Sequence, residues 1–334
     1  MSVLPSDCVK VVCQYLSISD LVTARQLCKH WRLTLLEDPQ FFATLLKSQF
    51  LPLEEAGLLD LRSDTAFQLL VLLSAYSAAN YRKDILQKVL YASSSDRWEE
   101  SSLNMIKGSV GKCYSSRRPL PLAQIMCQCT MGDPCYWSSA PSPDENSSEF
   151  IIFQGETFSL VDSLLVRPYQ ASWHPGSPIY GPKEVIVEFL EPLSSDIAYP
   201  ALPSRKFAVN EFRSNAEFNN VERAYYRSPA LPLSHSRGPH LLRLPKPQLL
   251  IGGRIRLVFR GKYQRQTLGG DDFYMCLNPC KVFGIPISTS RYTVDNYEDR
   301  GTQKTKFTIQ RIDTSREPIV ERPDSLPSIS LFLL

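Results

Sequence analysis

The sequence has no large excess of charge of either sign and no apolar run long enough to cross a bilayer. Lysine and arginine number 37 against 34 aspartates and glutamates, so the net charge predicts binding neither to nucleic acid nor to an anionic membrane. The most apolar run, residues 66–79, is shorter than the roughly 18 residues of a membrane-spanning helix and predicts a buried helix instead. The N-terminus lacks the pattern of a secretory signal, so we expect a cytoplasmic or nuclear protein.

Metal-binding and catalytic motifs are also scarce. The nine cysteines, an odd number, lie mostly within apolar patterns, which favours a reducing compartment over a disulfide framework. Cys127, Cys129 and Cys135 are close in sequence, but neither a Cys-x-x-Cys pair nor a nearby histidine completes a zinc site or a RING. The four histidines are isolated in the pattern, and no cysteine has an evident catalytic partner. The sequence therefore predicts no metal, no cofactor and no catalytic residue.

Residues 3–36 are unusually apolar for so short a segment. Ser6 is the expected N-cap of a first helix, with Asp7 in the first turn, where the helix dipole favours an acid. At about 100° per residue, the apolar side chains of this helix cover an arc of roughly 200°, about twice that of an ordinary surface helix. In angular order they are Val11, Tyr15, Cys8, Val12, Leu16, Val9 and Cys13. A helix that is apolar on two sides needs two surfaces to pack on.

Two further short helices are expected after a second cap at Ser19 and Asp20. Leu21 and Leu27 have helical spacing on the first of them, and Trp31 lies on the second. Three helices in about 35 residues bury too little surface to be stable alone. The surplus apolar face must therefore meet either another protein or the rest of this chain, and the spacing leaves both possibilities open.

The same segment carries a recognisable motif: Leu4-Pro5, Asp20-Leu21, Leu27-Cys28-Lys29 and Trp31-Arg32. In order and spacing it resembles the F-box, and the alternative is a helical hairpin packed on its own domain. The resemblance implies docking on a Skp-family adaptor, through which a cullin and a RING subunit complete an SCF-type ubiquitin ligase. It also implies that the adaptor contacts, or residues that hold the three helices together, are Leu4, Pro5, Val9, Val12, Leu16, Leu21, Leu27 and Trp31.

The chain as a whole predicts an α+β multidomain protein. After the F-box (1–38), apolar stripes at helical spacing continue to about residue 90, and we expect a helical linker over 39–100. Residues 101–287 contain short runs rich in β-branched and aromatic residues, separated by prolines and glycines, which indicates an antiparallel β-sandwich. The segment 288–334 is charged, contains several prolines and shows little periodicity, so we expect a partly disordered tail.

Two strands of the expected sandwich show a regular alternation. Residues 183–190 alternate as in an antiparallel sheet with one wetted face. Residues 253–264 direct four cations to one face, namely Arg254, Arg256, Arg260 and Lys262. Such a row is able to bind a phosphate or an acidic peptide. In the alternative interpretation it is a solvated face balanced by acids on a neighbouring strand, with Glu184 and Glu188 as the candidates.

Residues 135–189 resemble the opening of a discoidin-like, galactose-binding-type jelly roll, in which Trp-Ser-Ser precedes a strand. Combined with the F-box, they also resemble a little-described group of plant F-box proteins. The jelly-roll resemblance implies that ligand contacts come from loops at one end of the sandwich. Because those loops diverge quickly, the resemblance assigns no contact residue.

One loop, residues 171–183, has the composition of a binding loop. Trp173, His174 and Tyr180 lie among prolines and glycines that stiffen the backbone, so aromatic surface is presented at little entropic cost. The alternative is a loop folded down onto the sandwich. The strands that can be recognised direct polar residues outward, so we predict the target site at this loop rather than on a sheet face. Trp137 is predicted to be a core residue.

These features favour a non-catalytic, substrate-recognition subunit of an SCF-type ubiquitin ligase. Its F-box would hold the adaptor, and its sandwich would capture an unknown protein or glycoprotein target. Two alternatives remain at this point. One is an F-box scaffold without a role in ubiquitylation, and the other is a lectin-like carbohydrate-binding protein whose N-terminal helices pack internally.

Overall fold

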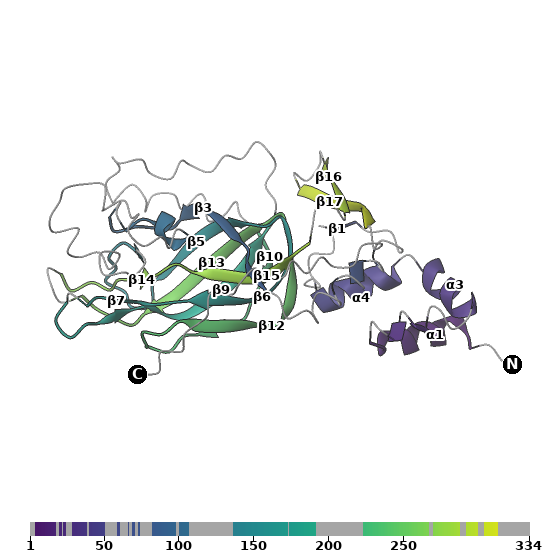
Figure 1. Cartoon of the computed structure of the whole chain (residues 1–334), viewed down its shortest axis with the longest axis horizontal. Coiled ribbons are helices and arrows are strands. Elements are labelled where there is room, and N and C mark those ends of the chain that lie inside the picture. Colours follow the sequence, from purple (N-terminus) through teal and green to yellow (C-terminus); the bar gives the residue numbers. More distant parts are fainter. Residues whose placement is uncertain are drawn as a thin grey trace, which may run out of the picture.

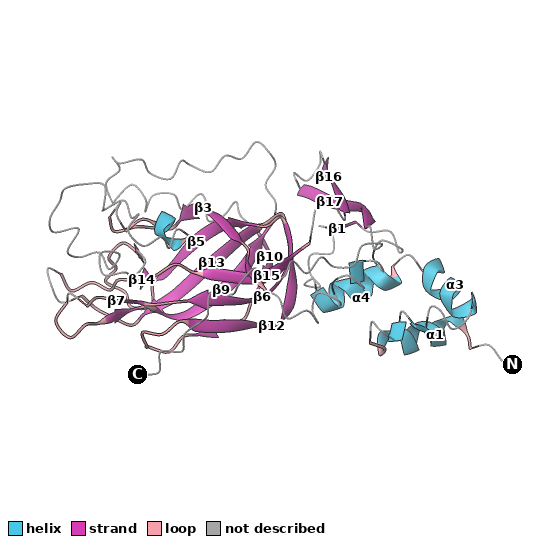
Figure 2. Ribbon diagram, viewed as in Figure 1, coloured by secondary structure: helices cyan, strands magenta, loops and turns pink. Residues whose placement is uncertain are grey.

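The computed structural model describes most of the sandwich and much of the N-terminal helical region. The described residues are 4–17, 20–21, 23–24, 29–38, 40–50, 59–60, 66, 69–70, 73, 82–97, 100–106, 136–172, 174–191, 223–266, 270–287, 292–299 and 304–312. The described α-helices gather at one end of the molecule, and the sandwich forms the other end (Figures 1 and 2). Within these ranges, no helix is both long and apolar enough to span a membrane.

The N-terminal region contains three described α-helices: α1 (Ser6–Gln14), α3 (Lys29–Glu37) and α4 (Phe41–Phe50). The expected N-cap at Ser6 is wrong by one residue, because Pro5 is the N-cap and no side chain caps the helix. The second expected cap is also displaced. Asp20 donates its backbone N–H to Ser17 Oγ at 3.2 Å, and the Ser17 hydroxyl donates to the Asp20 carboxylate at 2.6 Å. Ser19 lies outside the described residues.

The sandwich consists of two antiparallel sheets that share one core (Figure 2), which confirms the predicted fold class. In the six-stranded sheet, the strand order is β10 (Ala224–Arg227), β9 (Pro182–Leu190), β13 (Arg254–Lys262), β5 (Ser148–Gly155) and β3 (Leu86–Ala92), with β11 (Leu231–Pro232) also paired to β9. In the four-stranded sheet, the order is β12 (His240–Ile251), β6 (Phe158–Val166), β15 (Lys281–Pro286) and β2 (Lys83–Asp84).

Two short strand pairs close one end of the sandwich. They are β4 (Trp137–Ser138) with β14 (Cys276–Leu277), and β7 (Tyr169–Gln170) with β8 (Ile179–Tyr180). A short 3-10 helix, η2 (Ser102–Met105), contacts β4 and β3. Trp137 is fully buried against Phe259, and its indole N–H donates to the Ser94 carbonyl at 3.0 Å. The prediction that Trp137 belongs to the core is therefore confirmed.

The helical linker expected over 39–100 is wrong in its last part. Residues 83–84 and 86–92 form β2 and β3, and each is an edge strand of one main sheet. A short apolar run does not distinguish a strand from a helix turn by its periodicity. Here the pairing partners decide, because β15 and β5 offer open edges to β2 and β3. Ile85, between the two strands, is buried in the shared core.

Two stretches of the segment 288–334, for which we expected a partly disordered tail, form strands. Strands β16 (Tyr292–Asp299) and β17 (Lys304–Ile312) form an antiparallel hairpin. Strand β17 also pairs in parallel with β1 (Leu59–Asp60), and Figure 1 shows this small sheet beside α4. The partner strand lies so far away in sequence that no local pattern in the tail could indicate it.

Candidate binding surfaces

Helix α1 carries an exposed apolar stripe along one face. Cys8, Val11, Val12 and Tyr15 follow the spacing i, i+3, i+4, i+7, which places them on one side of a helix. All four are exposed, and Tyr15 retains 85% of its accessible surface. Leu4, just before the helix, is also exposed. Exposed large apolar side chains are common singly, but a continuous row of them marks a surface that binds something.

The opposite side of α1 is buried. Val9 and Cys13 have 0% of their surface exposed, and Leu16 packs partly against the same cluster, which includes Leu35 of α3. Burial raises the pKa of the Cys13 thiol, as expected for an apolar environment. The prediction that the first helix is apolar on two sides is thus confirmed, with one side packed within the chain and one side open.

Polar contacts fix the position of α1 against α3. The His30 ring nitrogen Nε2 lies 3.0 Å from the Leu4 carbonyl oxygen, so the segment before α1 is held against α3. Lys10 and Asp38 form an ion pair at 3.0 Å, and the hydrogen bond from Lys10 lowers the pKa of the Asp38 carboxyl. These two contacts hold α1 on α3, and the exposed stripe of α1 faces outward.

The eight predicted adaptor residues differ in how far they are exposed. Leu4, Pro5 and Val12 are exposed, whereas Val9 and Leu21 are buried and hold the helices together. Leu16 and Trp31 are partly buried against the core, and Leu27 lies outside the described residues. The predicted contact residues did not include Cys8, Val11 and Tyr15, which are exposed on the same face of α1. Their angular position next to Val12 was the signal that could have identified them.

The loop 171–183 is folded down where it is described. Tyr180 has 2% of its surface exposed, and its hydroxyl donates to Gln266 Oε1 at 3.3 Å. Burial raises its pKa to about 12. His174 is also buried, with Nδ1 2.8 Å from the Pro175 carbonyl oxygen. The expectation of exposed aromatics is therefore wrong for both residues. Trp173 lies outside the described residues, so its role in target binding stays a prediction.

Tyr180 belongs to a small core of its own. Its neighbours in this cluster are Tyr136, Tyr169, Ala171 and Cys276, and the rings of Tyr136 and Tyr169 stack with centroids 3.7 Å apart. A sequence pattern did not reveal this second core, since its members come from three separate segments. It occupies the end of the sandwich where β7 and β14 lie (Figure 1).

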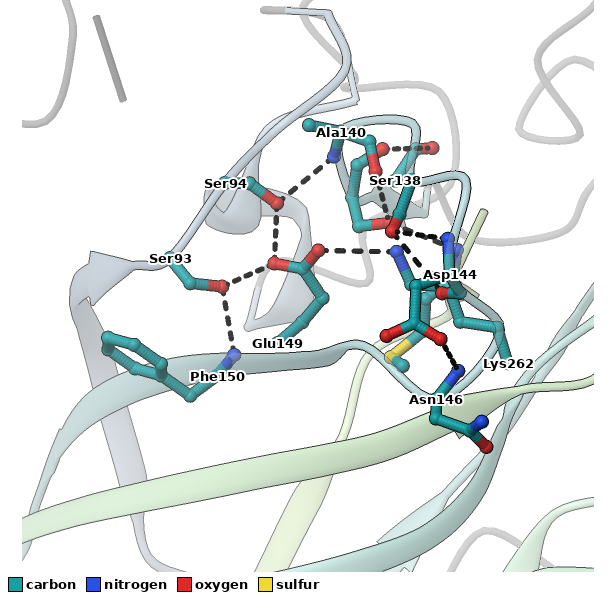
Figure 3. A network of polar contacts seen from close by, with 12 residues as sticks. Ser93, Ser94, Ser138, Ala140, Asp144, Asn146, Glu149, Phe150 and Lys262 are labelled. Atoms are coloured by element: carbon teal, nitrogen blue, oxygen red, sulfur yellow. Dashed lines mark hydrogen bonds and ion pairs between the residues drawn. The ribbon is translucent and has the colours of Figure 1, made fainter. Parts of the chain in front are cut away.

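A buried ion pair organises the same end of the sandwich (Figure 3). Lys262 has 0% of its surface exposed, and its ammonium lies 3.3 Å from Glu149 Oε1. The hydroxyls of Ser93 and Ser94 each donate to Glu149 Oε2 at 2.6 Å. The hydroxyl of Ser94 also accepts the backbone N–H of Ala140 at 3.0 Å. A buried carboxylate is tolerated only with such partners, so we interpret this network as support for the surrounding loops.

The row of cations on β13 is engaged within its own sheet. Arg256 and Arg227 both pair with the buried Glu188. Arg260 pairs with Glu184 at 2.9 Å. The interpretation of the row as a face balanced by Glu184 and Glu188 is therefore confirmed for Arg256 and Arg260. Lys262 departs from it, because its side chain is buried with Glu149.

No group of three His, Cys, Asp or Glu side chains that could hold a metal ion occurs within the described ranges. Cys127, Cys129 and Cys135, weighed as a zinc site, lie outside those ranges. The described cysteines Cys276 and Cys280 are fully buried, and burial raises the pKa of both thiols far above the usual value. Such thiols are poor nucleophiles at neutral pH.

A known protein family matches the helical region at the start of the chain. Residues 1–39 match the family model described as the F-box domain. This segment is an F-box domain. Over 170 residues the chain is 27% identical to F-box protein At4g00755 of Arabidopsis thaliana, a match that covers 50% of this chain and 43% of the relative. The chain therefore spans less than half the length of that relative. The exposed stripe of α1 and the packed Val9 both belong to the F-box domain.

Several solved carbohydrate-binding modules are similar to the part of the chain that contains the sandwich. A family 32 module of C. perfringens NanJ, solved with galactose, has 8% identity and a TM-score of 0.33, covering 61% of this chain and 99% of that module. Chitosan-binding module 1 from a Paenibacillus sp. IK-5 chitosanase/glucanase has 10% identity and a TM-score of 0.32, covering 60% and 99%. Similarity at this low sequence identity and TM-score gives no information about the ligand that the sandwich of this chain binds.

Proposed function

We propose that this chain is a substrate-recognition subunit of an SCF-type ubiquitin ligase. Its F-box domain binds a Skp-family adaptor, which joins it to the cullin and the RING subunit, and its sandwich captures a protein or glycoprotein target in the cytoplasm or nucleus. The observation that supports this most directly is the open stripe of Val11, Val12 and Tyr15 on a helix whose other side is packed.

The stripe provides enough apolar surface for a stable contact. Fully burying one aliphatic or aromatic side chain contributes about 1.5–3 kcal/mol, so the exposed residues of α1 together offer several kcal/mol to a partner. Aromatic residues tend to dominate such interfaces, and Tyr15 is the most exposed large side chain of the stripe. We therefore expect Tyr15 and Val12 to be the main adaptor contacts.

The arrangement of the two regions suits a positional role. The helices α1 and α3 lie at one end of the molecule, and the sandwich end with β7 and β14 lies at the other (Figure 1). A subunit that holds its target at a fixed distance from a charged enzyme acts by raising the effective concentration of the target's lysines. In this proposal the chain supplies no catalytic group of its own.

The test is co-expression of the full-length chain with a Skp-family adaptor, followed by capture of the adaptor. Val12→Glu places a charge in the stripe without touching the buried side, so we expect lost capture with an unchanged melting temperature. Gln14→Ala is the matched control, since Gln14 is exposed on α1 but off the stripe. Equal capture by the wild-type chain and Val12→Glu would overturn the adaptor assignment.

A second measurement separates a ligase subunit from a scaffold. Proteins captured by the full chain are identified first. Their turnover is then measured in cells that express either the wild-type chain or Val12→Glu. A substrate receptor predicts that these proteins accumulate in the variant. Unchanged turnover despite lost adaptor capture contradicts the ligase role and leaves a scaffold.

A further inference from the structure

The outward face of the four-stranded sheet carries an apolar patch that the expected pattern of polar outward residues does not predict. Leu241 of β12 lies opposite Leu165 of β6, which in turn lies opposite Lys281 of β15. Residues directly opposite in an antiparallel pair share one face. The adjoining row of Leu242, Leu164 and Val282 points into the core, where Leu164 and Val282 are buried. Leu241, Leu165 and Lys281 must therefore point outward.

A second outward row completes the patch two residues further along the strands. It runs Arg243, Ser163, Phe283 across β12, β6 and β15. Leu241 is 51% exposed, and Leu165 and Phe283 are partly exposed. Neighbouring strands lie about 4.8 Å apart and two residues span about 6.8 Å along a strand, so the three apolar side chains form a diagonal about 12 Å long. We call Leu165, Leu241, Phe283, Arg243 and Lys281 the sheet-face patch.

The charged residues of the sheet-face patch are both cations. Arg243 and Lys281 are exposed, and neither forms an ion pair with any described residue. Of the nearby acids, Asp162 pairs with Arg82. Asp84 lies opposite Phe283 at the edge of this face, where it accepts the backbone N–H groups of Leu86 and Val282 and interacts electrostatically with Lys281. Each cation borders two of the apolar side chains, so apolar and cationic positions alternate over the patch.

From this arrangement we infer that the sheet-face patch is a docking surface for an extended acidic segment of a partner protein, in which carboxylates alternate with apolar side chains. Such a segment places its apolar residues on Leu165, Leu241 and Phe283 and its carboxylates near Arg243 and Lys281. An anionic membrane is a poorer fit, because lipid recognition takes clusters of four to eight basic residues. This inference concerns the sandwich alone and does not depend on adaptor binding.

The test uses the purified full-length chain and three labelled peptides, with binding followed by fluorescence anisotropy. The first peptide alternates glutamate with leucine and phenylalanine, the second replaces glutamate by lysine, and the third replaces the apolar residues by serine. We expect saturable binding of the first peptide alone. Binding should weaken as salt is raised, since exposed charges are screened.

Variants locate the site on the protein. Lys281→Glu and Leu241→Glu should each weaken binding of the acidic peptide by about tenfold, which corresponds to the loss of one good contact. Arg243→Glu provides a third variant if either of these lowers the melting temperature. Lys88→Glu is the matched control, since Lys88 is an exposed lysine on β3 of the other sheet, and it should bind as the wild type does.

Several outcomes overturn the inference. Equal binding of the lysine peptide, or equal binding by wild type and the patch variants, removes the proposed chemistry. Binding to phosphatidylserine vesicles that is lost in Lys281→Glu, without binding of the peptide, assigns the patch to a lipid surface instead. Concentration-dependent self-association that disappears in Leu241→Glu assigns it to a second copy of this chain.

Discussion

Helix α1 of the F-box domain and strand β13 of the sandwich both have two chemically distinct faces, but only β13 has partners for both. Its apolar face lies in the shared core, and its cations pair with Glu184, Glu188 and Glu149. Helix α1 packs Val9 and Cys13 and leaves Val11, Val12 and Tyr15 open. Strand β13 thus has partners for both faces within the sandwich, whereas helix α1 leaves one apolar face open.

Removal of its largest fully buried side chain, Trp137, is the strongest test of the packing of the sandwich core. Trp137→Ala leaves a cavity and removes the hydrogen bond to the Ser94 carbonyl, so we expect a loss of about 3–5 kcal/mol in the free energy of unfolding. Urea denaturation measures it. Trp137→Phe, which keeps an aromatic ring, should lose less. A loss below about 1 kcal/mol for alanine would contradict a packed core at this site.

The buried ion pair of Lys262 and Glu149 allows a test of whether the buried charges of the sandwich depend on each other. Lys262→Met leaves the Glu149 carboxylate buried without its cation, which should destabilise the chain by about 3 kcal/mol. Adding Glu149→Gln should recover part of that loss, because the buried charge is then gone. Chemical denaturation of both single variants and the double variant measures the coupling. Additive losses would show that the two groups do not interact.

A pair of substitutions on α1 sharpens the difference between its faces. Val9→Ala removes two buried methyl groups, so we expect a loss of about 1.5 kcal/mol in stability. Val12→Ala makes the same chemical change on the open face and should alter stability by less than about 0.5 kcal/mol. Thermal melting of the free chain compares them. Similar destabilisation by both would mean that the stripe is packed within the chain.

The smallest expected effect concerns alkaline pH and the second core. Burial raises the pKa of Tyr180 from 10.0 to about 12, so the unfolded chain loses this proton before the folded chain does. The contribution of Tyr180 to stability should therefore be lost between pH 10 and pH 12. Tyr180→Phe has no proton to lose, and its stability should decline less over the same interval. Parallel declines would mean that Tyr180 is accessible to water.

Local periodicity predicted the features that depend on one element or two adjacent strands. The two faces of α1 follow from residue spacing alone. The pairing of Arg256 with Glu188 and of Arg260 with Glu184 follows from the alternation of two strands that lie side by side. Alternation indicated which side chains of each strand share a face, and the hypothesis that the two strands are neighbours is confirmed by their pairing.

The features that the sequence did not predict depend on contacts between segments that are distant in sequence. Residues 86–92 form a strand because β5, which is distant in sequence, has an open edge. Residues 304–312 pair both with the neighbouring strand β16 and with β1, and only the pairing with β1 joins segments far apart in sequence. Lys262 is buried although alternation places it with the exposed cations, because the chain around Glu145 and Glu149 covers the end of β13. The sheet-face patch likewise unites three strands from separate parts of the chain.

The pairing of β2 with β15 has a consequence for synthesis of the chain. Asp84 lies opposite Phe283, so the four-stranded sheet needs residues separated by roughly 200 positions. At about 5–20 residues per second, the ribosome takes roughly 10–50 s to pass from the end of the F-box domain to β15. The open stripe of α1 therefore enters the cell well before the sandwich has its last strands. We expect a nascent chain at that stage to expose the apolar stripe of α1 while the sandwich is still incomplete.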